Sequence, residues 1–89
     1  MRLSWDEAKR RANLRKHGLD FADAESVFAG ITVTMEDRRF DYREQRLVTL
    51  GLLRDTVVVI AHLEGQQEVR IISMRKATRR EQTLFFESI

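Results

Sequence analysis

The stretch from Thr56 to Leu63 constrains the fold more than any other segment of the chain. Its centre, Val57 to Ala61, is apolar at every position, so both faces of an extended strand there must be kept from water. A tight turn at Arg54-Asp55 precedes it, and the loop Glu64-Gly65-Gln66-Gln67 follows it. The chain must therefore build a sheet covered on both faces, with this segment as a central strand.

The flanking sequence supplies neighbours for that strand. The patterns of Gln45 to Leu53 and of Glu68 to Arg75 predict strands, and their short connections favour antiparallel pairing. Ile31 to Met35 is predicted as a further short strand, before the charged stretch Glu36 to Arg46. We expect an antiparallel sheet of three to four strands.

A first helix is predicted at the start of the chain. Ser4-Trp5-Asp6-Glu7 has the spacing of a capping box, and Gly18 is placed to end the helix. Trp5, Ala8 and Ala12 form an apolar stripe at helical spacing, which would face the core.

Two more helices are predicted around the sheet. One begins at Asp20 and ends at Gly30, with its apolar residues on one side. Thr78-Arg79-Arg80-Glu81 is a second capping box and opens a last helix that runs to Ile89. The predicted fold is a single α+β domain over residues 1–89, with two helices before the sheet and one after it.

Composition narrows the class of protein. Eighty-nine residues make one domain, and the absence of cysteine excludes disulfides and thiolate chemistry. No apolar run approaches the roughly 18 residues of a membrane span, and the first residues lack the apolar core of a signal peptide. We expect a cytoplasmic protein with no membrane contact.

The net charge of +2 is distributed unevenly. Residues 8–19 contain five Lys or Arg and no acid, and residues 69–80 again contain five and none. Two such segments on a small domain suit a phosphate-binding surface, although they also suit helix faces that are simply solvated. Direct DNA binding by the second helix is disfavoured because Asp20, Asp23 and Glu25 would repel phosphates.

Metal and nucleotide chemistry are poorly supported by the sequence. The two histidines have no metal-ligand spacing, arginines interleave with Asp37, Asp41 and Glu44, and the glycines form no phosphate loop. We expect no metal and no cofactor. RNA cleavage needs neither, because the 2′-hydroxyl of the substrate attacks the neighbouring phosphate once a base, an acid and cations are supplied.

Candidates exist for each of these roles, and each has a structural alternative. His62 shares a strand face with Val58 and Ile60, which also suits a hydrogen-bonded core histidine, and His17 is placed to cap helix carbonyls. Glu81 is a capping residue that also points toward the sheet, where Arg70 or Arg75 would pair with it. Phe40 and Tyr42 suit base stacking or packing under the sheet edge.

Two spaced motifs resemble the BrnT family, the toxin half of a bacterial type II toxin–antitoxin pair. The first consists of Trp5, Asp6, Lys9, Asn13, Lys16, His17 and Gly18. The second consists of Arg70, Ile72, Ser73, Arg75, Ala77, Thr78 and Glu81.

This resemblance implies a fold similar to RelE toxins and an RNA-cleaving activity that arrests growth. It also implies a cognate antitoxin, usually a ribbon-helix-helix protein, whose complex with the toxin binds operator DNA. Family members often carry a tyrosine about four residues after the final glutamate, where this chain has Phe85.

Residues and resemblance together predict a metal-independent endoribonuclease that blocks translation. The expected catalytic residues are Arg70, Arg75, His62, Glu81 and Lys9. The expected RNA-binding residues are Asn13, Lys16, His17, Arg79, Arg80 and Arg46. The competing interpretation is a non-catalytic module that uses the same surface to hold RNA, an antitoxin or a ribosomal partner.

Overall fold

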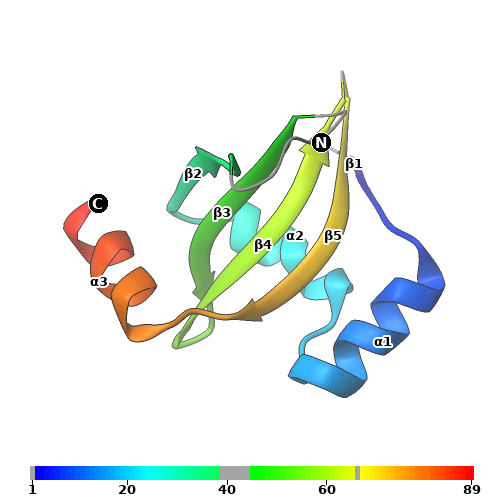
Figure 1. The fold of residues 1–89 in the computed structure, drawn as a ribbon, viewed down its shortest axis with the longest axis horizontal. Helices are drawn as coiled ribbons and strands as arrows, with labels where there is room; N and C mark the ends of the chain where they lie inside the picture. The colour runs from blue at the N-terminus through cyan, green and yellow to red at the C-terminus, as the bar shows by residue number, and fades with distance from the viewer. Residues whose placement is uncertain (1, 39–44, 66) are drawn as a thin grey trace.

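The computed structural model describes residues 2–38, 45–65 and 67–89. Its elements (Figure 1) are β1 Arg2–Ser4, α1 Glu7–His17, the 3₁₀-helix η1 Phe21–Asp23, α2 Ala24–Ala29, β2 Thr32–Glu36, β3 Arg46–Leu53, β4 Thr56–Glu64, β5 Glu68–Lys76 and α3 Arg79–Glu87. None of the helices within these ranges has the length and apolar character that a membrane crossing requires.

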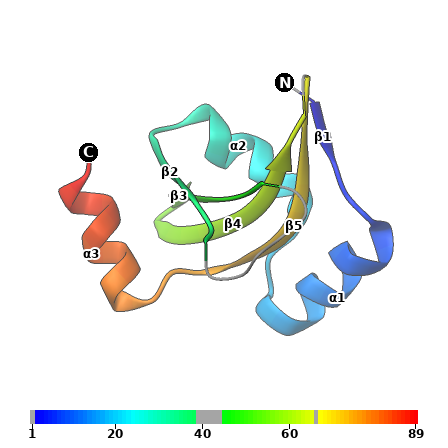
Figure 2. The same cartoon turned by 45° about the horizontal axis from the view of Figure 1, so that its top comes forward.

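The described strands form one sheet in the order β1-β5-β4-β3-β2. Strands β2 to β5 are an antiparallel meander, as predicted, while β1 pairs parallel to β5. Helix α2 lies behind the curved sheet, and α1 and α3 stand at opposite sides of it (Figures 1 and 2). The α+β class is therefore confirmed.

The prediction of three to four strands was wrong, because the described sheet has five. The missing strand is β1, which is only three residues long and too short for a periodic signal. Because β1 precedes α1, the predicted placement of two helices before the whole sheet was also wrong. The predicted capping box at Ser4 was also wrong, because the chain is still in β1 at this residue. Ser4 belongs to β1, and the α1 N-cap is Asp6, whose side chain accepts from the Ala8 and Lys9 amides.

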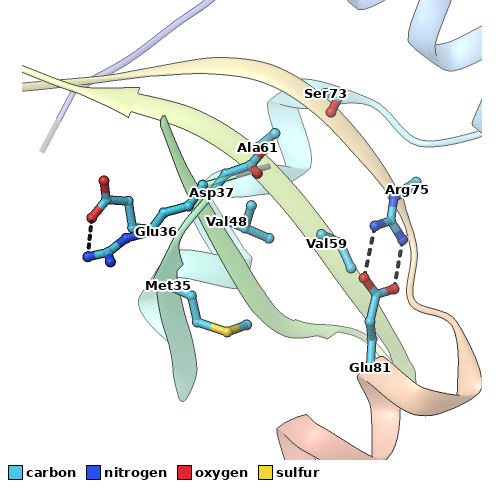
Figure 3. Close-up of a pocket in the computed structure, with 10 residues that line it drawn as sticks. Met35, Glu36, Asp37, Val48, Val59, Ala61, Ser73, Arg75 and Glu81 are labelled. Atoms are coloured by element: carbon cyan, nitrogen blue, oxygen red, sulfur yellow. Dashed lines mark hydrogen bonds and ion pairs between the residues drawn. The ribbon is translucent and has the colours of Figure 1, made fainter. Parts of the chain in front are cut away.

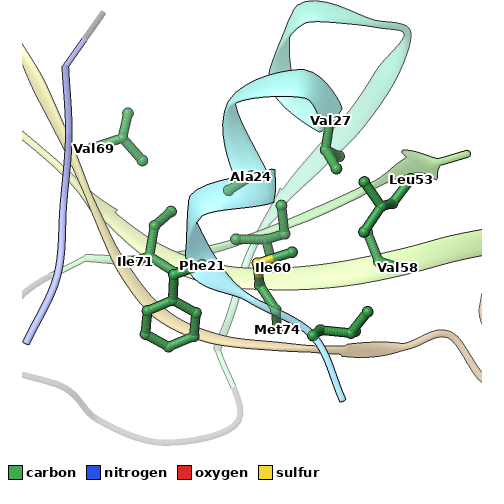
Figure 4. Packing of buried hydrophobic residues seen from close by; sticks show 10 residues of the cluster. Phe21, Ala24, Val27, Leu53, Val58, Ile60, Val69, Ile71 and Met74 are labelled. Carbon is green, nitrogen blue, oxygen red and sulfur yellow. The ribbon is translucent and has the colours of Figure 1, made fainter. Parts of the chain in front are cut away.

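One face of the sheet, which we call the α2 face, carries the larger core. Val58, Ile60 and Met74 point from the strands toward η1 and α2 and are almost completely buried there (Figure 4). Helix α2 approaches β3 closely, since a Cβ atom at Gly51 would lie 2.7 Å from Val27 Cγ1. The predicted apolar positions Phe21, Ala24, Val27 and Phe28 all pack into this core.

The opposite, α3 face carries a smaller core of Leu50, Val57, Val59, Ala77 and Phe85. Helix α3 begins with the predicted capping box, in which Thr78 and Glu81 bond to each other's backbone amides. Its nine residues cover only one end of this face. At the other end, the described helices leave the strands β3, β4 and β5 open (Figure 1).

A β-bulge in β5 decides which side chains reach that open end. His62 of β4 is level with Ile71, but Ala61 is level with Ser73, so Ile72 is an extra residue. Side chains alternate between the two faces of a strand, and one extra residue reverses the alternation. Ile71 therefore faces α2, whereas Ser73 and Arg75 face the open side.

Helix α1 is attached to the outer edge of β5 by a polar contact. The Asn13 carboxamide donates to the Met74 carbonyl at 2.9 Å and accepts from the Met74 amide at 3.1 Å, and it also donates to the Leu19 carbonyl at 3.1 Å. Asn13 thus continues the sheet past the end of β1. The predicted apolar stripe was wrong, because Ala8 and Ala12 are exposed.

Candidate active site

An arginine and a glutamate form a bidentate ion pair at the open end of the α3 face. Arg75 of β5 donates through both terminal nitrogens to the two Glu81 oxygens, at 2.8 and 2.9 Å. The pairing predicted for Glu81 is confirmed, with Arg75 as the partner. Arg75 lowers the pKa of Glu81 to about 2, with help from the Thr78 amide, so Glu81 is ionised at neutral pH.

A pocket of about 260 Å³ lies beside this ion pair, and we call it the Arg75 pocket. Its floor is apolar, formed by Val48, Val59 and Ala61 of the sheet (Figure 3). The side opposite Arg75 is lined by Met35 and Glu36 at the end of β2 and by Asp37 and Arg38 just beyond it, so two carboxylates also face the pocket. The pocket therefore combines an apolar floor with a guanidinium at its edge, a pairing suited to a base and its phosphate.

A second, more open pocket of about 230 Å³ runs between α1 and β5, and we call it the α1 groove. Its cationic side chains, Lys9 and Lys16, come from one side of the helix, where His17 also lies. Ser73 lines both the α1 groove and the Arg75 pocket. The two basic segments of the sequence therefore meet at Ser73.

Comparison with protein families matches residues 5–81 to the family described as ribonuclease toxin, BrnT, of type II toxin–antitoxin systems. This chain belongs to the BrnT family. The matched segment contains the residues from Lys9 to Glu81, and the family is that of ribonuclease toxins, which implies an antitoxin as partner. A search of curated proteins gave no match.

Arg70, the other arginine predicted to be catalytic in this BrnT chain, lies apart from Arg75. Arg70 is exposed near the start of β5, five residues and on the order of 15 Å from Arg75. It lies beside Asp6, whose pKa is lowered mainly by the Lys9 and Ala8 amides and further by Lys9 and Arg70. One phosphate cannot contact both arginines, so Arg70 would hold a different one.

Three other predicted RNA-binding arginines also lie outside both pockets. Arg79 and Arg80 are exposed in the first turn of α3. Arg46 is partly buried at the start of β3, on a strand position level with Leu63 of β4. None of these three arginines therefore lies at the Arg75–Glu81 pair or in the α1 groove.

His62 lies on the α2 face, away from the Arg75 pocket, and is fully buried. Its Nε2 is 2.7 Å from Thr49 Oγ1, and its ring packs edge-on against Phe28. Burial lowers the pKa of His62, an effect that Glu64 partly opposes, so the imidazole is neutral. The core interpretation is confirmed, and His62 has no path to a substrate on the other face.

Asn13 and Phe85 are likewise parts of the framework. Asn13 is buried, and its amide is already used by the backbone of Met74 and Leu19. Phe85 is fully buried in the smaller core. Phe40 and Tyr42, proposed for base stacking, and the acidic pair Asp41 and Glu44 lie outside the described residues.

Ser73 is the site residue to which sequence reasoning gave no role. It stands in the second motif, but strand alternation counted from Val69 and Ile71 would place it on the buried face. Only the bulge turns it outward. No spacing in the sequence around Ile72 signals this reversal.

Proposed function

We propose that this BrnT chain is a metal-independent endoribonuclease, that its active site is the Arg75 pocket, and that RNA cleavage blocks translation and growth. One observation carries the proposal: the Arg75–Glu81 pair stands on an open sheet face and adjoins the basic α1 groove at Ser73. This arrangement offers a cation, a carboxylate and a basic approach path to one RNA strand.

Arg75 is proposed to bind the scissile phosphate. A guanidinium recognises carboxylate and phosphate through the same planar set of N–H donors. Glu81 holds the Arg75 guanidinium in place before RNA arrives, at 2.8 and 2.9 Å. When phosphate replaces Glu81 on these donors, Arg75 stabilises the negative charge that builds up on the phosphoryl oxygens.

Glu81 and Lys9 are proposed to transfer the protons. Arg75 is the main cause of the low pKa of Glu81, so exchange of Arg75 from Glu81 to phosphate makes the carboxylate more basic. Glu81 then takes the proton of the 2′-hydroxyl, whose oxygen attacks phosphorus. Lys9, from the α1 groove, donates a proton to the departing 5′-oxygen, with His17 as the reserve donor.

The remaining cations are proposed to bind the RNA backbone. Lys16 and His17 line the α1 groove and would hold the phosphates next to the scissile one. Arg70, Arg46, Arg79 and Arg80 are placed to contact the strand farther out. We expect each such contact to make binding weaker at higher salt.

The antitoxin is proposed to be a ribbon-helix-helix protein that neutralises this toxin in the cytoplasm. The toxin would reach operator DNA only through that complex. The acidic residues Asp23 and Glu25, at the start of α2, support this arrangement because they disfavour direct insertion of this helix into DNA.

The test is incubation of purified, antitoxin-free protein with labelled RNA in excess EDTA. Wild type should cleave and leave cyclic phosphate ends, whereas Arg75→Ala and Glu81→Ala should not. Arg11→Ala is the matched control, because Arg11 is exposed on α1 and lines neither pocket. Cleavage only with added Mg²⁺ would refute metal independence, and cleavage under neither condition would favour the non-catalytic alternative.

A further inference from the structure

Among the lining residues that the structure describes, Ser73 is the one shared by the Arg75 pocket and the α1 groove. Its side chain is partly exposed, and its hydroxyl makes no hydrogen bond to any residue that the structure describes. The framework of the described chain therefore does not need this hydroxyl. A donor at the boundary between two solvent-accessible pockets is available to a ligand that spans them.

The backbone is shaped to put Ser73 there. The extra residue Ile72 interrupts regular pairing between β4 and β5, and bulges of this kind re-aim side chains beside active sites. Ser73 and Arg75 consequently lie on the same face of β5, two residues and roughly 7 Å apart. Figure 3 shows both side chains on this strand, with Glu81 reaching Arg75 from α3.

The charges of the α1 groove favour an anionic ligand at Ser73. Lys9 and Lys16 line the groove on one side, whereas the Arg75 pocket on the other side carries two arginines together with the carboxylates of Glu36, Asp37 and Glu81. A hydroxyl between cations donates favourably to a phosphate oxygen, because a hydrogen bond to a charged acceptor is stronger than one to a neutral acceptor. A sugar–phosphate strand supplies such an oxygen at every nucleotide.

We propose that Ser73 binds the phosphate that follows the scissile one, where the RNA passes from the Arg75 pocket into the α1 groove. The inference rests on the proposed ribonuclease function and deepens it, since the substrate becomes a single RNA strand that fills both pockets. An unpaired base lies on the apolar floor of Val48 and Val59, and its neighbour lies along α1.

Ser73→Ala and Ser73→Thr test this role through KM and kcat for a labelled single-stranded RNA. Loss of one hydrogen bond to phosphate should raise KM roughly tenfold or more and leave kcat nearly unchanged. Ser73→Thr should restore KM because it keeps the hydroxyl. Ser26→Ala is the matched control, since Ser26 lies on α2 and bonds to the Asp23 carbonyl.

Substrate length gives a result that a merely structural role would not produce. A dinucleotide has only the scissile phosphate, so Ser73→Ala should cleave it as well as wild type does. Equal impairment on the dinucleotide and the long RNA, or no rescue by threonine, would overturn the proposal. So would an unchanged KM on the long RNA.

Binding of a 2′-O-methyl RNA strand, which cannot be cleaved, separates this inference from the proposed function. Ser73→Ala should weaken binding of this strand roughly tenfold. If wild type binds the strand in this Ser73-dependent way but cleaves no RNA, the ribonuclease proposal fails and the Ser73 contact stands. If wild type cleaves but Ser73→Ala binds normally, the Ser73 contact alone fails.

Discussion

The two faces of the sheet each hold titratable side chains, but in opposite surroundings. On the α2 face, His62 is fully buried against Thr49 and Phe28, and burial lowers its pKa. On the α3 face, Arg75 and Glu81 keep 37% and 25% of their side-chain surface exposed and remain ionised as a pair.

The difference follows from how each face is covered. Helix α2 and η1 exclude water from the middle of the sheet, so a titratable group there is stable only in its neutral form. Helix α3 covers one end of the other face and leaves a partly solvated edge, where a charged pair costs little. Of these two sites, only the α3 face presents charge to a phosphate.

The largest loss of stability should come from a substitution of Asn13, which bonds to the backbone of β5 at its outer edge. Asn13→Ala removes three hydrogen bonds and leaves the Met74 amide and carbonyl without these partners. We expect the free energy of unfolding to fall by about 2–4 kcal/mol, measured by urea denaturation. Asn13→Asp keeps the acceptor for the Met74 amide but sets a buried carboxylate against the carbonyl oxygens of Met74 and Leu19, so it should be no more stable than Asn13→Ala. A loss below about 0.5 kcal/mol would show that Asn13 does not hold this edge.

Arg75→Lys tests whether the site on the α3 face needs the two donors of Arg75 or only its charge. Lysine keeps the charge but loses the planar pair of donors that binds both Glu81 and phosphate. We expect kcat/KM for RNA to fall on the order of a hundredfold, while the melting temperature changes little because the pair is partly exposed. Arg11→Lys is the control. Full activity in Arg75→Lys would mean that a point charge suffices and that the bidentate geometry is not used.

A smaller effect is expected on the pH dependence of folding stability, through His62 on the α2 face. The pKa of His62 is below 6.5 in the folded protein, so the unfolded chain binds a proton more readily. Folding stability should therefore fall as pH drops below about 6.5, by at most about 1.4 kcal/mol per pH unit, until His62 itself is protonated. His62→Gln should remove this contribution. An identical pH dependence in the variant would contradict a neutral, buried His62.

Much of this architecture was predictable because its signals are local. The apolar run from Val57 to Ala61 predicted a central strand, and the Thr78–Glu81 spacing predicted the cap and the direction of Glu81. The strand face that His62 shares with Val58 and Ile60 indicated the buried alternative, which the structure shows, although His62 was also expected among the catalytic residues. Each of these inferences needs only a periodicity or a spacing within one element.

The rest depended on contacts between distant segments. Nothing in the sequence near Ile72 marks the bulge, which arises from the register against β4 and reverses the faces of Ser73 and Arg75. Strand β1 exists because β5 offers it an edge, and it removes Ser4 from the predicted cap. Asn13 was read as an RNA contact because its partner Met74 lies 61 residues away.

The most direct test compares Arg75→Ala with His62→Gln, measuring both RNA cleavage and the free energy of unfolding for each. We predict that Arg75→Ala loses at least roughly a hundredfold in kcat/KM and unfolds within about 1 kcal/mol of wild type. His62→Gln should be less stable by about 1–3 kcal/mol yet cleave normally wherever it is folded. The reverse pattern, with cleavage lost in folded His62→Gln and kept in Arg75→Ala, would place the chemistry on the other face and contradict the account.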